Sequence, residues 1–373
     1  MINLIKMSFI PRRIFPNFNL PLSNFKGHQQ KALTKFGHLS PQIDLVLELR
    51  DCRAPISTIN VLFDKVLGKK DRIIIYTKKD LSVINNDLLQ KWHGINNEKY
   101  IFVDSRSHKD AKKVIQLISD YYYNMDPPPP LGLRSMIIGM PNIGKSTLVN
   151  SLRAVGYSNQ VDSISKKKRK VAQTGGQPGV TKTTSEVIRL SEEPDILAYD
   201  TPGVFLPTVK DNETMLALSL VGCVHNSFID PVIQADYLLY ILNLQDPSGS
   251  KYREYIDHPT NSIDELLYHI ALKRNKVRAN GSFDESGMAS HWTNLWKNGK
   301  SDRYKGLFDL QTIIEKDGKK LRVLFNAEKE RVSTMSVTEK LNSSFGKSDA
   351  VNARRKRTAK DREYDLRNQL FRL

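Results

Sequence analysis

Short apolar runs that end in polar residues recur through the first half of the chain. The runs at 43–51 (IDLVLELRD), 72–80 (RIIIYTKKD) and 99–107 (KYIFVDSRS) each predict a buried strand. Further strands are predicted at 134–139, 185–190 and 195–200. Apolar runs of this kind are typical of parallel strands, whose carboxyl ends meet at one edge of a sheet. The sequence therefore predicts an α/β domain with a mostly parallel sheet flanked by helices, and a site at that edge.

Helical periodicity separates these strands and dominates from about residue 210. After Ser107, a predicted N-cap, apolar residues repeat at helical spacing as far as Tyr122. The prolines at 127–130 cannot continue that helix and form a stiff linker. Later helical patterns at 213–224, 230–243 and 262–274, the last with a Ser262 to Glu265 capping box, predict a smaller, mainly helical C-terminal domain.

The net charge of the chain indicates which class of partner it attracts. The chain carries a formal net charge of +17, which attracts polyanions, nucleic acid before anionic membrane; a basic surface without a specific partner is the alternative. Cys52 and Cys223 match no metal spacing and indicate a reducing compartment or buried thiols. No apolar run approaches the roughly 20 residues that span a bilayer. The start, free of acidic residues before Asp44, predicts a mitochondrial transit segment at 1–24.

The octet GMPNIGKS at 139–146 fits the phosphate-loop pattern between a predicted strand and a predicted helix. Its glycines let backbone N–H groups face phosphate oxygens, and the following helix N-terminus adds a favourable dipole. Lys145 is expected to reach the β- and γ-phosphates, and Ser146 to ligate Mg²⁺. The residues predicted to bind nucleotide in this loop are Gly139, Asn142, Ile143, Gly144, Lys145, Ser146 and Thr147.

The turn DTPG at 200–203 is the predicted γ-phosphate switch. Asp200 would hold Mg²⁺ through water, and the Gly203 N–H would meet the γ-phosphate. Thr181, in the run PGVTKTT, is chosen for the hydroxyl that completes the Mg²⁺ shell when the γ-phosphate is present, with Thr183 and Thr184 as rivals. The predicted Mg²⁺ ligands are thus Ser146, Thr181 and Asp200.

Two loops earlier in the chain are predicted to read the base: Thr77, Lys78, Lys79 and Asp80, then Ser105 and Arg106. The Asp80 carboxylate can accept hydrogen bonds from guanine N1–H and the 2-amino group, which adenine cannot offer. Lys78 would pack along the ring, and the Ser105 N–H would meet O6. Taken alone, TKKD is more often a charged turn. Because these loops precede the phosphate loop, the sequence indicates a circularly permuted GTPase whose old termini are joined at the prolines.

This order of motifs resembles the circularly permuted GTPases of the YlqF/RbgA ribosome-assembly family, specifically the mitochondrial ribosome-associated GTPase 1 type. The segment LRDCRAPIST (49–58) looks like the family's D-x-R-x-P-x-S element, and 25–36 resembles its N-terminal segment. Val204, directly after DTPG, cannot orient a water, so the resemblance implies His28 for that catalytic role. It also implies potassium binding by Asn142. Thr77 departs from the family's usual Asn, which predicts a weaker bridge to the phosphate loop.

The resemblance implies a function and a domain plan. The function is a slow, ribosome-stimulated GTPase in the mitochondrial matrix, with possible peripheral attachment to the inner membrane, which binds the assembling large ribosomal subunit and its rRNA as the GTP form. The plan is a transit segment at 1–24, a permuted GTPase domain at 25–209, a helical RNA-binding domain at 210–345 and a basic tail at 346–373. A GTP-gated RNA- or membrane-binding module with little hydrolysis, or a tRNA-modification GTPase, are the alternatives.

Overall fold

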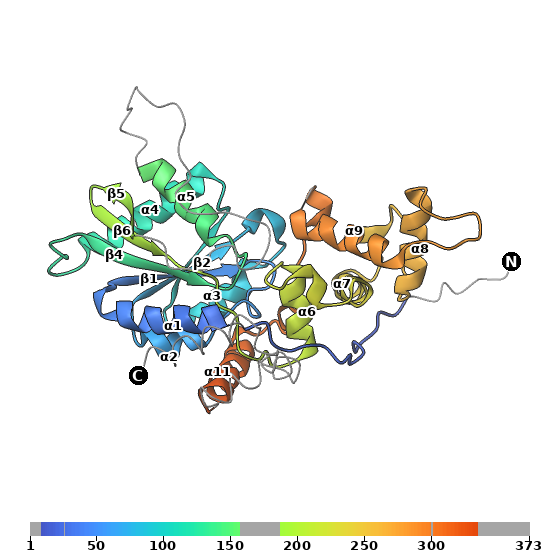
Figure 1. The fold of residues 1–373 in the computed structure, drawn as a ribbon, viewed down its shortest axis with the longest axis horizontal. Coiled ribbons are helices and arrows are strands. Elements are labelled where there is room, and N and C mark those ends of the chain that lie inside the picture. The colour runs from blue at the N-terminus through green and yellow to red at the C-terminus, as the bar shows by residue number, and fades with distance from the viewer. Residues whose placement is uncertain (1–8, 26, 157–186, 300, 335–373) are drawn as a thin grey trace, which may run out of the picture.

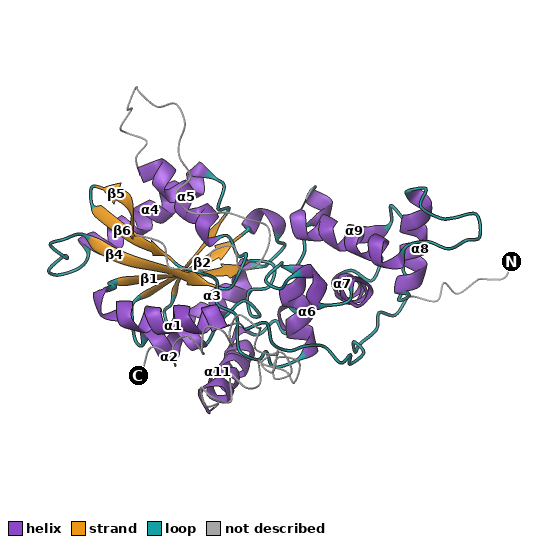
Figure 2. Cartoon of the chain, viewed as in Figure 1, coloured by secondary structure: helices purple, strands orange, loops and turns teal. Residues whose placement is uncertain are grey.

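The computed structural model describes residues 9–25, 27–156, 187–299 and 301–334. A single sheet stands beside a helical region (Figures 1 and 2). The strand order is β3-β2-β1-β4-β6-β5, and every neighbouring pair is parallel except β5 and β6. The six strands are β1 (Leu45–Asp51), β2 (Arg72–Thr77), β3 (Lys99–Val103), β4 (Leu133–Gly139), β5 (Val187–Glu192) and β6 (Asp195–Asp200). The predicted mostly parallel α/β sheet is confirmed.

The permuted connectivity is visible in the sheet itself. The first three strands of the chain and the last three form two halves, which join where β1 pairs with β4. Leu49 of β1 lies opposite Gly139 of β4, so the segment after β1 and the phosphate loop start side by side. Asp51 likewise lies opposite Thr77 of β2. The register therefore brings predicted base-reading and phosphate-binding loops to the same edge, although they are far apart in sequence.

Helices cover both faces of the sheet (Figure 2). On one face, α4 (His108–Tyr123) packs against α5 (Lys145–Gly156), and on the other α1 (Gly27–Leu39) packs against α2 (Leu62–Leu67). A further helix, α3 (Asn86–Gly94), joins β2 to β3. The Ser107 hydroxyl accepts a hydrogen bond from Asp110 N (3.3 Å), so the predicted cap of α4 is confirmed.

The helical region is built around α7 (Pro231–Gln245), which is buried along most of its length between α6 (Asn212–Leu220) and α9 (Glu285–Asn298). Next to α9 lies α8 (Ile263–Lys273), whose Ser262 cap accepts from Glu265 N as predicted. The reciprocal half of the predicted capping box does not form, because Ser262 N donates to Thr260 Oγ1 and the Glu265 carboxylate is engaged by Thr260 and His258. The short helix α10 (Leu310–Ile314) follows. An all-round apolar helix such as α7 is stable only when neighbours surround it, which makes this region a packed unit.

Two segments cross the boundaries that the sequence suggested. Residues 9–24 run along the helical region, where the Phe15 ring lies 5.3 Å from that of Tyr237, and Arg12 pairs with Asp236. At the other end, α11 (Gly318–Thr334) returns to pack on α3 and α2 of the sheet domain. The predicted boundaries after residues 24 and 209 stay predictions; the chain crosses between the two regions more often than a simple two-domain plan implies.

The two cysteines and the apolar helices bear on two expectations from the composition. Both cysteines are free thiols and fully buried, and burial raises the pKa of Cys223 to about 12. They therefore match the buried-thiol interpretation. Within the ranges that the structure describes, no helix is long and apolar enough to cross a membrane. Thr181, Thr183 and Thr184 lie outside the described residues.

Candidate functional site

The phosphate loop has the backbone shape that its glycines predict. It connects the end of β4 at Gly139 to the start of α5 at Lys145, with φ of +151° at Gly139 and +100° at Gly144. A Cβ at position 139 would lie 2.7 Å from the Leu49 carbonyl oxygen, so only glycine fits beside β1. Asn142 adopts a left-handed conformation with φ of 57°, which Asn tolerates better than most residues. The loop is therefore wound tightly at the edge of the sheet.

Lys145 lies buried inside this loop. Its Nζ donates to the carbonyl oxygens of Met140 (2.7 Å) and Gly139 (3.2 Å), and the residue is only 7% exposed. Burial lowers the pKa of Lys145 to about 8, with Asp200 opposing the shift. A buried ammonium group whose closest partners are neutral carbonyls favours an incoming anion. This is the electrostatic setting that phosphate binding requires.

The DTPG turn lies directly against the phosphate loop. Ser146 Oγ donates to Asp200 Oδ2 at 3.0 Å, and Val204 N donates to the Gly139 carbonyl at 3.2 Å. A Cβ at Gly203 would lie 2.5 Å from the Pro141 Cα, so the close approach depends on glycine. Two loops that are some sixty residues apart in sequence therefore share one packed contact.

Ser146 and Asp200 fit a Mg²⁺ site. A hydroxyl and a carboxylate are the hard oxygen ligands that Mg²⁺ takes beside water and nucleotide phosphates. Burial raises the pKa of Asp200, and a divalent cation at this carboxylate would favour its charged form. Among the residues in the described ranges, no group of three or more His, Cys, Asp or Glu could hold a metal ion.

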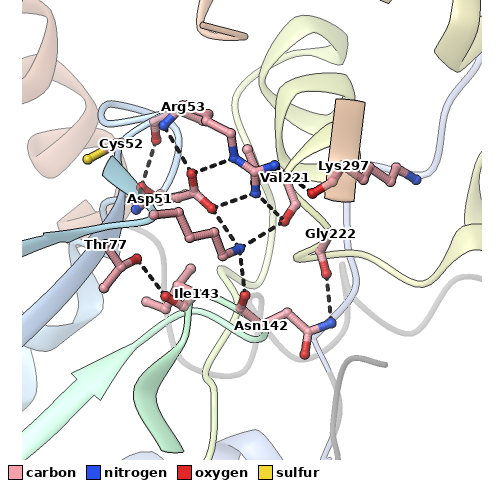
Figure 3. A network of polar contacts seen from close by, with 12 residues as sticks. Asp51, Cys52, Arg53, Thr77, Asn142, Ile143, Val221, Gly222 and Lys297 are labelled. Atoms are coloured by element: carbon pink, nitrogen blue, oxygen red, sulfur yellow. Dashed lines mark hydrogen bonds and ion pairs between the residues drawn. The ribbon is translucent and has the colours of Figure 1, made fainter. Parts of the chain in front are cut away.

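The base-reading loop after β2 is bonded to the phosphate loop. Thr77 Oγ1 donates to the Ile143 carbonyl at 2.6 Å, and Lys78 Nζ donates to the Asn142 carbonyl at 2.8 Å (Figure 3). The hydroxyl of Thr77 thus makes the bridge that was expected to be weaker than one from Asn. The structure also uses the Lys78 ammonium group for these contacts, whereas the sequence suggested only packing of its stem along a base.

The second base-reading loop, after β3, also reaches the phosphate side of the site. Ser151 of α5 donates to the Ser105 carbonyl at 2.6 Å. The Ser105 hydroxyl is buried, has no hydrogen-bond partner among the described residues, and would lie 3.3 Å from a Cβ at Gly144. The predicted motifs therefore converge at the carboxyl edge of one sheet, and Thr147 follows them on the first turn of α5.

Asp80, the predicted guanine reader, lies at the rim of this edge. Its carboxylate pairs with Arg106 at 2.7 Å, and the neighbouring Lys79 pairs with Asp110 at 2.5 Å. The Arg106 side chain is 70% exposed, so breaking its pair with Asp80 costs little. A base that enters the site would compete with Arg106 for the same carboxylate.

Asp51 and Arg53 form a contact to which no role was assigned from the sequence. The Arg53 guanidinium binds both carboxylate oxygens of Asp51 at 2.9 Å, and Lys78 Nζ lies 2.8 Å from one of them. Arg53 also donates to the carbonyls of Val221 (3.3 Å) and Lys297 (2.9 Å) in the helical region (Figure 3). We call Asp51, Arg53, Lys78 and these two carbonyls the clasp. It connects the base-reading loop to the ends of α6 and α9.

The Asp51–Arg53 ion pair at the centre of the clasp is buried. Arg53 is 1% exposed and Asp51 is 0% exposed. Burial alone would raise the pKa of Asp51, but the charges of Arg53 and Lys78 lower it well below the usual range for a carboxyl group. Burial of opposite charges is tolerated only when each finds several partners, as these do. The clasp therefore fixes the position of the helical region relative to the base-reading loop.

Two further contacts extend the same interface. Asn142 of the phosphate loop donates its side-chain amide to the Gly222 carbonyl at 3.0 Å, next to the clasp (Figure 3). Asp309 accepts hydrogen bonds from Ile56 N (2.6 Å) and Ser57 N (3.1 Å), and burial raises the pKa of Asp309 to about 6. Arg53, Ile56 and Ser57 of the 49–58 element thus contact the helical region, and the phosphate loop contacts it through Asn142.

His28 lies in the first turn of α1, close in sequence to a contact with the switch segment. The side-chain oxygen of its neighbour Gln29 accepts a hydrogen bond from Phe205 N at 2.8 Å, and Val204 is fully buried. The start of α1 is therefore held beside the residues that follow DTPG. Nothing in this geometry tests whether His28 orients a water, and that role stays a prediction.

Comparison with known proteins gives a consistent set of relatives. Residues 134–276 match the model of the 50S ribosome-binding GTPase family. Mitochondrial GTPase 1 of Saccharomyces cerevisiae is 38% identical over 348 residues, covering 88% of this chain and 91% of that protein. Mitochondrial ribosome-associated GTPase 1 of Xenopus tropicalis is 32% identical over 290 residues, covering 74% of this chain and 87% of that protein.

Two solved structures are similar more distantly. The GNP-bound YlqF from T. maritima is 21% identical with a TM-score of 0.48, covering 73% of this chain and 96% of that one. The GDP-bound TM YlqF is 19% identical with a TM-score of 0.47, covering 71% and 95%. Likenesses this distant say nothing about substrates or partners.

Proposed function

The chain belongs to the mitochondrial GTPase 1 family of circularly permuted GTPases, and we propose that it hydrolyses GTP on the assembling large ribosomal subunit in the mitochondrial matrix. The observation that carries this proposal is the meeting of the phosphate, DTPG and base-reading loops at one edge of the sheet. The clasp supports the coupling of that edge to the helical region, because it joins the base-reading loop to α6 and α9.

The proposed chemistry assigns each group one task. Lys145 holds the β- and γ-phosphates, and Asp80 accepts hydrogen bonds from guanine. Ser146 and Asp200, with Thr181 from outside the described residues, would hold Mg²⁺, which neutralises phosphate charge when bound. His28, as neutral imidazole, orients the attacking water, since the buried apolar Val204 cannot. The products are GDP and phosphate, and the isolated enzyme is slow because the ribosome completes the site.

The proposed ribosomal partner is inferred from the net charge of the chain and from its similarity to ribosome-associated GTPases. The net charge of +17 favours rRNA, whose phosphates fix a protein in position without reading sequence. Potassium beside Asn142 and peripheral attachment to the inner membrane are further parts of the proposal. The contact from Asn142 to Gly222 gives this residue a second task, which is to join the phosphate loop to the helical region.

Sedimentation of mitochondrial extract tests the ribosomal part. With the protein held in a non-hydrolysable GTP state, it should migrate with the large subunit, and the association should weaken steeply with salt. In the GDP state it should remain in the light fractions. Equal migration in both states would contradict a GTP-dependent partner.

Substitution of His28 tests the catalytic part. His28→Ala should abolish the ribosome-stimulated rate of GTP hydrolysis and keep GTP affinity. His38→Ala, at the other end of the same helix, is the matched control and should keep both. A full stimulated rate in His28→Ala removes this histidine from the mechanism. No stimulation by ribosomes in the native protein would favour a GTP-gated binding module instead.

A further inference from the structure

A second concave surface lies at the opposite side of the sheet from the nucleotide loops. It is a cavity of about 800 Å³ between α11, α2 and the segments that lead into β2 and β3. We call it the basal groove. It exists because α11 returns from the helical region and packs beside α2 and α3 (Figure 1). Arg322 of α11 binds Glu98, and Lys329 pairs with Asp64 at 2.8 Å, so two ion pairs hold this wall in place.

Basic residues outnumber acidic residues in the lining of the basal groove. Eight basic and three acidic residues line it. The acidic groups are already engaged within the protein: Glu98 by Arg322, Asp64 by Arg72 and Lys329, and Asp71 by the Tyr121 hydroxyl at 2.6 Å. The unmatched charge of the groove is therefore positive.

Four lysines account for most of that excess. Lys65, Lys69, Lys70 and Lys99 have no carboxylate within ion-pair distance among the described residues. They come from α2, from the segment before β2 and from the start of β3, so they surround the groove. Asn96 and Asn97 line it as well, and an Asn amide is a neutral donor and acceptor. Lysines and amides in one concavity suit a chain of phosphates and sugars.

We propose that the basal groove binds the phosphate backbone of RNA, as a second contact site separate from the nucleotide edge and the helical region. The inference rests on the proposed function, which supplies the RNA. Lysine is a point charge that does not select among bases, so binding here would fix position without sequence preference. The GTPase domain itself would then hold RNA, in addition to any contact made by the helical region.

Two other occupants fit less well. The chain leaves α11 at the groove, where Ser333 lines it, but residues 335–373 carry ten Lys or Arg against five Asp or Glu and would be repelled. A flat anionic membrane cannot follow a concave surface. The exposed apolar residues of α11, Val323 and Leu324, are not among those that line the groove. RNA is thus the polyanion that both charge and shape favour.

Neutralising two of the lysines in the full chain tests the proposal. Lys69→Gln/Lys70→Gln should weaken binding to an RNA of about 20 uridines by about 10- to 30-fold near 0.1 M salt, because two phosphate contacts are lost. The slope of log affinity against log salt should fall by about 1.4. The matched control is Lys112→Gln/Lys113→Gln, two adjacent exposed lysines on α4 outside the groove, which should change neither value.

GTP affinity and melting temperature should be unchanged in both double variants. Unchanged values show that the fold and the nucleotide site are intact, so failure of this test can be distinguished from failure of the proposed function. If the double variant melts early, Lys99→Gln alone should lower the slope by about 0.7. Equal weakening in the groove and control variants, or in neither, overturns the proposal. The proposal is also overturned if the groove variant loses binding to phosphatidylserine vesicles but keeps its binding to RNA, because the groove would then bind a membrane.

Discussion

The carboxyl and amino edges of the sheet use basic side chains in opposite ways. At the carboxyl edge, Arg53, Lys78 and Lys145 turn inward and donate to carboxylates or backbone carbonyls. At the amino edge, lysines such as Lys69 and Lys99 remain exposed in a groove whose acidic groups are already engaged. Arg53 and Lys78 order loops and hold the helical region, Lys145 is placed for the nucleotide phosphates, and the exposed lysines of the amino edge are available to another partner.

The net charge of +17 therefore includes cations of two kinds. A charge count shows that a polyanion is attracted, but it does not show which cations are structural. The charge of the partners decides: a cation paired with a buried carboxylate contributes to the fold, whereas a cation without a carboxylate partner attracts anions from outside. Substitutions at the carboxyl edge should therefore affect stability and nucleotide binding, whereas substitutions at the amino edge should affect RNA binding.

The largest effect is expected at the clasp. Arg53→Ala leaves Asp51 buried with Lys78 as its remaining charged partner, and should lower the free energy of unfolding by about 3–5 kcal/mol. Urea or thermal unfolding of the full chain measures this loss. Arg106→Ala removes an ion pair of similar length at the exposed rim and should cost at most about 1 kcal/mol. Similar costs for the two variants would contradict a structural clasp.

The next effect is on nucleotide affinity. Lys145→Met keeps much of the side-chain volume but removes the buried charge that faces the phosphates. Loss of a hydrogen bond to a charged group costs about 1.5–3 kcal/mol, so GTP affinity should fall roughly 10- to 150-fold. Titration with a fluorescent GTP analogue measures it. Affinity within about twofold of the native protein would place the phosphates elsewhere.

The effect of pH on GTP affinity should be smaller than the effect of Lys145→Met, and the pKa of Lys145 determines its direction. In the free protein the pKa of Lys145 is about 8, below its unfolded value, so this group loses its proton as pH rises through 8. Bound phosphate favours the charged form and raises that pKa, so binding above pH 8 takes up a proton. GTP affinity should therefore fall as pH rises above 8, by up to about tenfold per pH unit. Calorimetry in two buffers of different ionisation enthalpy counts the proton; no uptake at pH 8.5 would contradict the shift.

The smallest effect is expected at the amino edge. Lys65→Gln and Lys99→Gln remove exposed cations that have no carboxylate partner within the described part of the chain, so each should change the free energy of unfolding by no more than about 0.5 kcal/mol. Chemical denaturation measures it. A loss of about 2 kcal/mol or more would mean that these lysines hold the fold, and the contrast between the edges would disappear.

Much of the scaffold could be predicted from local patterns. Apolar runs located each strand of the described residues, and Ser107 and Ser262 cap their helices as predicted, because caps depend on a few neighbouring residues. The phosphate loop was predictable because glycine spacing encodes backbone shape. The permuted order followed from where the motifs stand in the chain.

The contacts between regions could not be predicted. Arg53 and Asn142 donate to the carbonyls of Val221, Lys297 and Gly222, and a backbone carbonyl leaves no signal in a sequence. The D-x-R-x-P-x-S element was the one available hint, since it pairs an acidic with a basic residue outside the nucleotide motifs. The return of α11 to the sheet domain and the packing of Phe15 on α7 depend on tertiary contacts over more than 200 residues.

Asp80 and Lys145 are proposed to hold opposite ends of one guanosine triphosphate, and the nucleotide selectivity of the protein tests this arrangement. Xanthine carries a carbonyl oxygen where guanine has its 2-amino group, so an amide at position 80 can donate to it. Affinities of the native protein and Asp80→Asn for GTP, ATP and xanthosine triphosphate should show GTP binding reduced by about 10- to 150-fold in the variant and xanthosine triphosphate preferred. An unchanged preference of Asp80→Asn for GTP over ATP would remove the TKKD loop from the site and contradict the account.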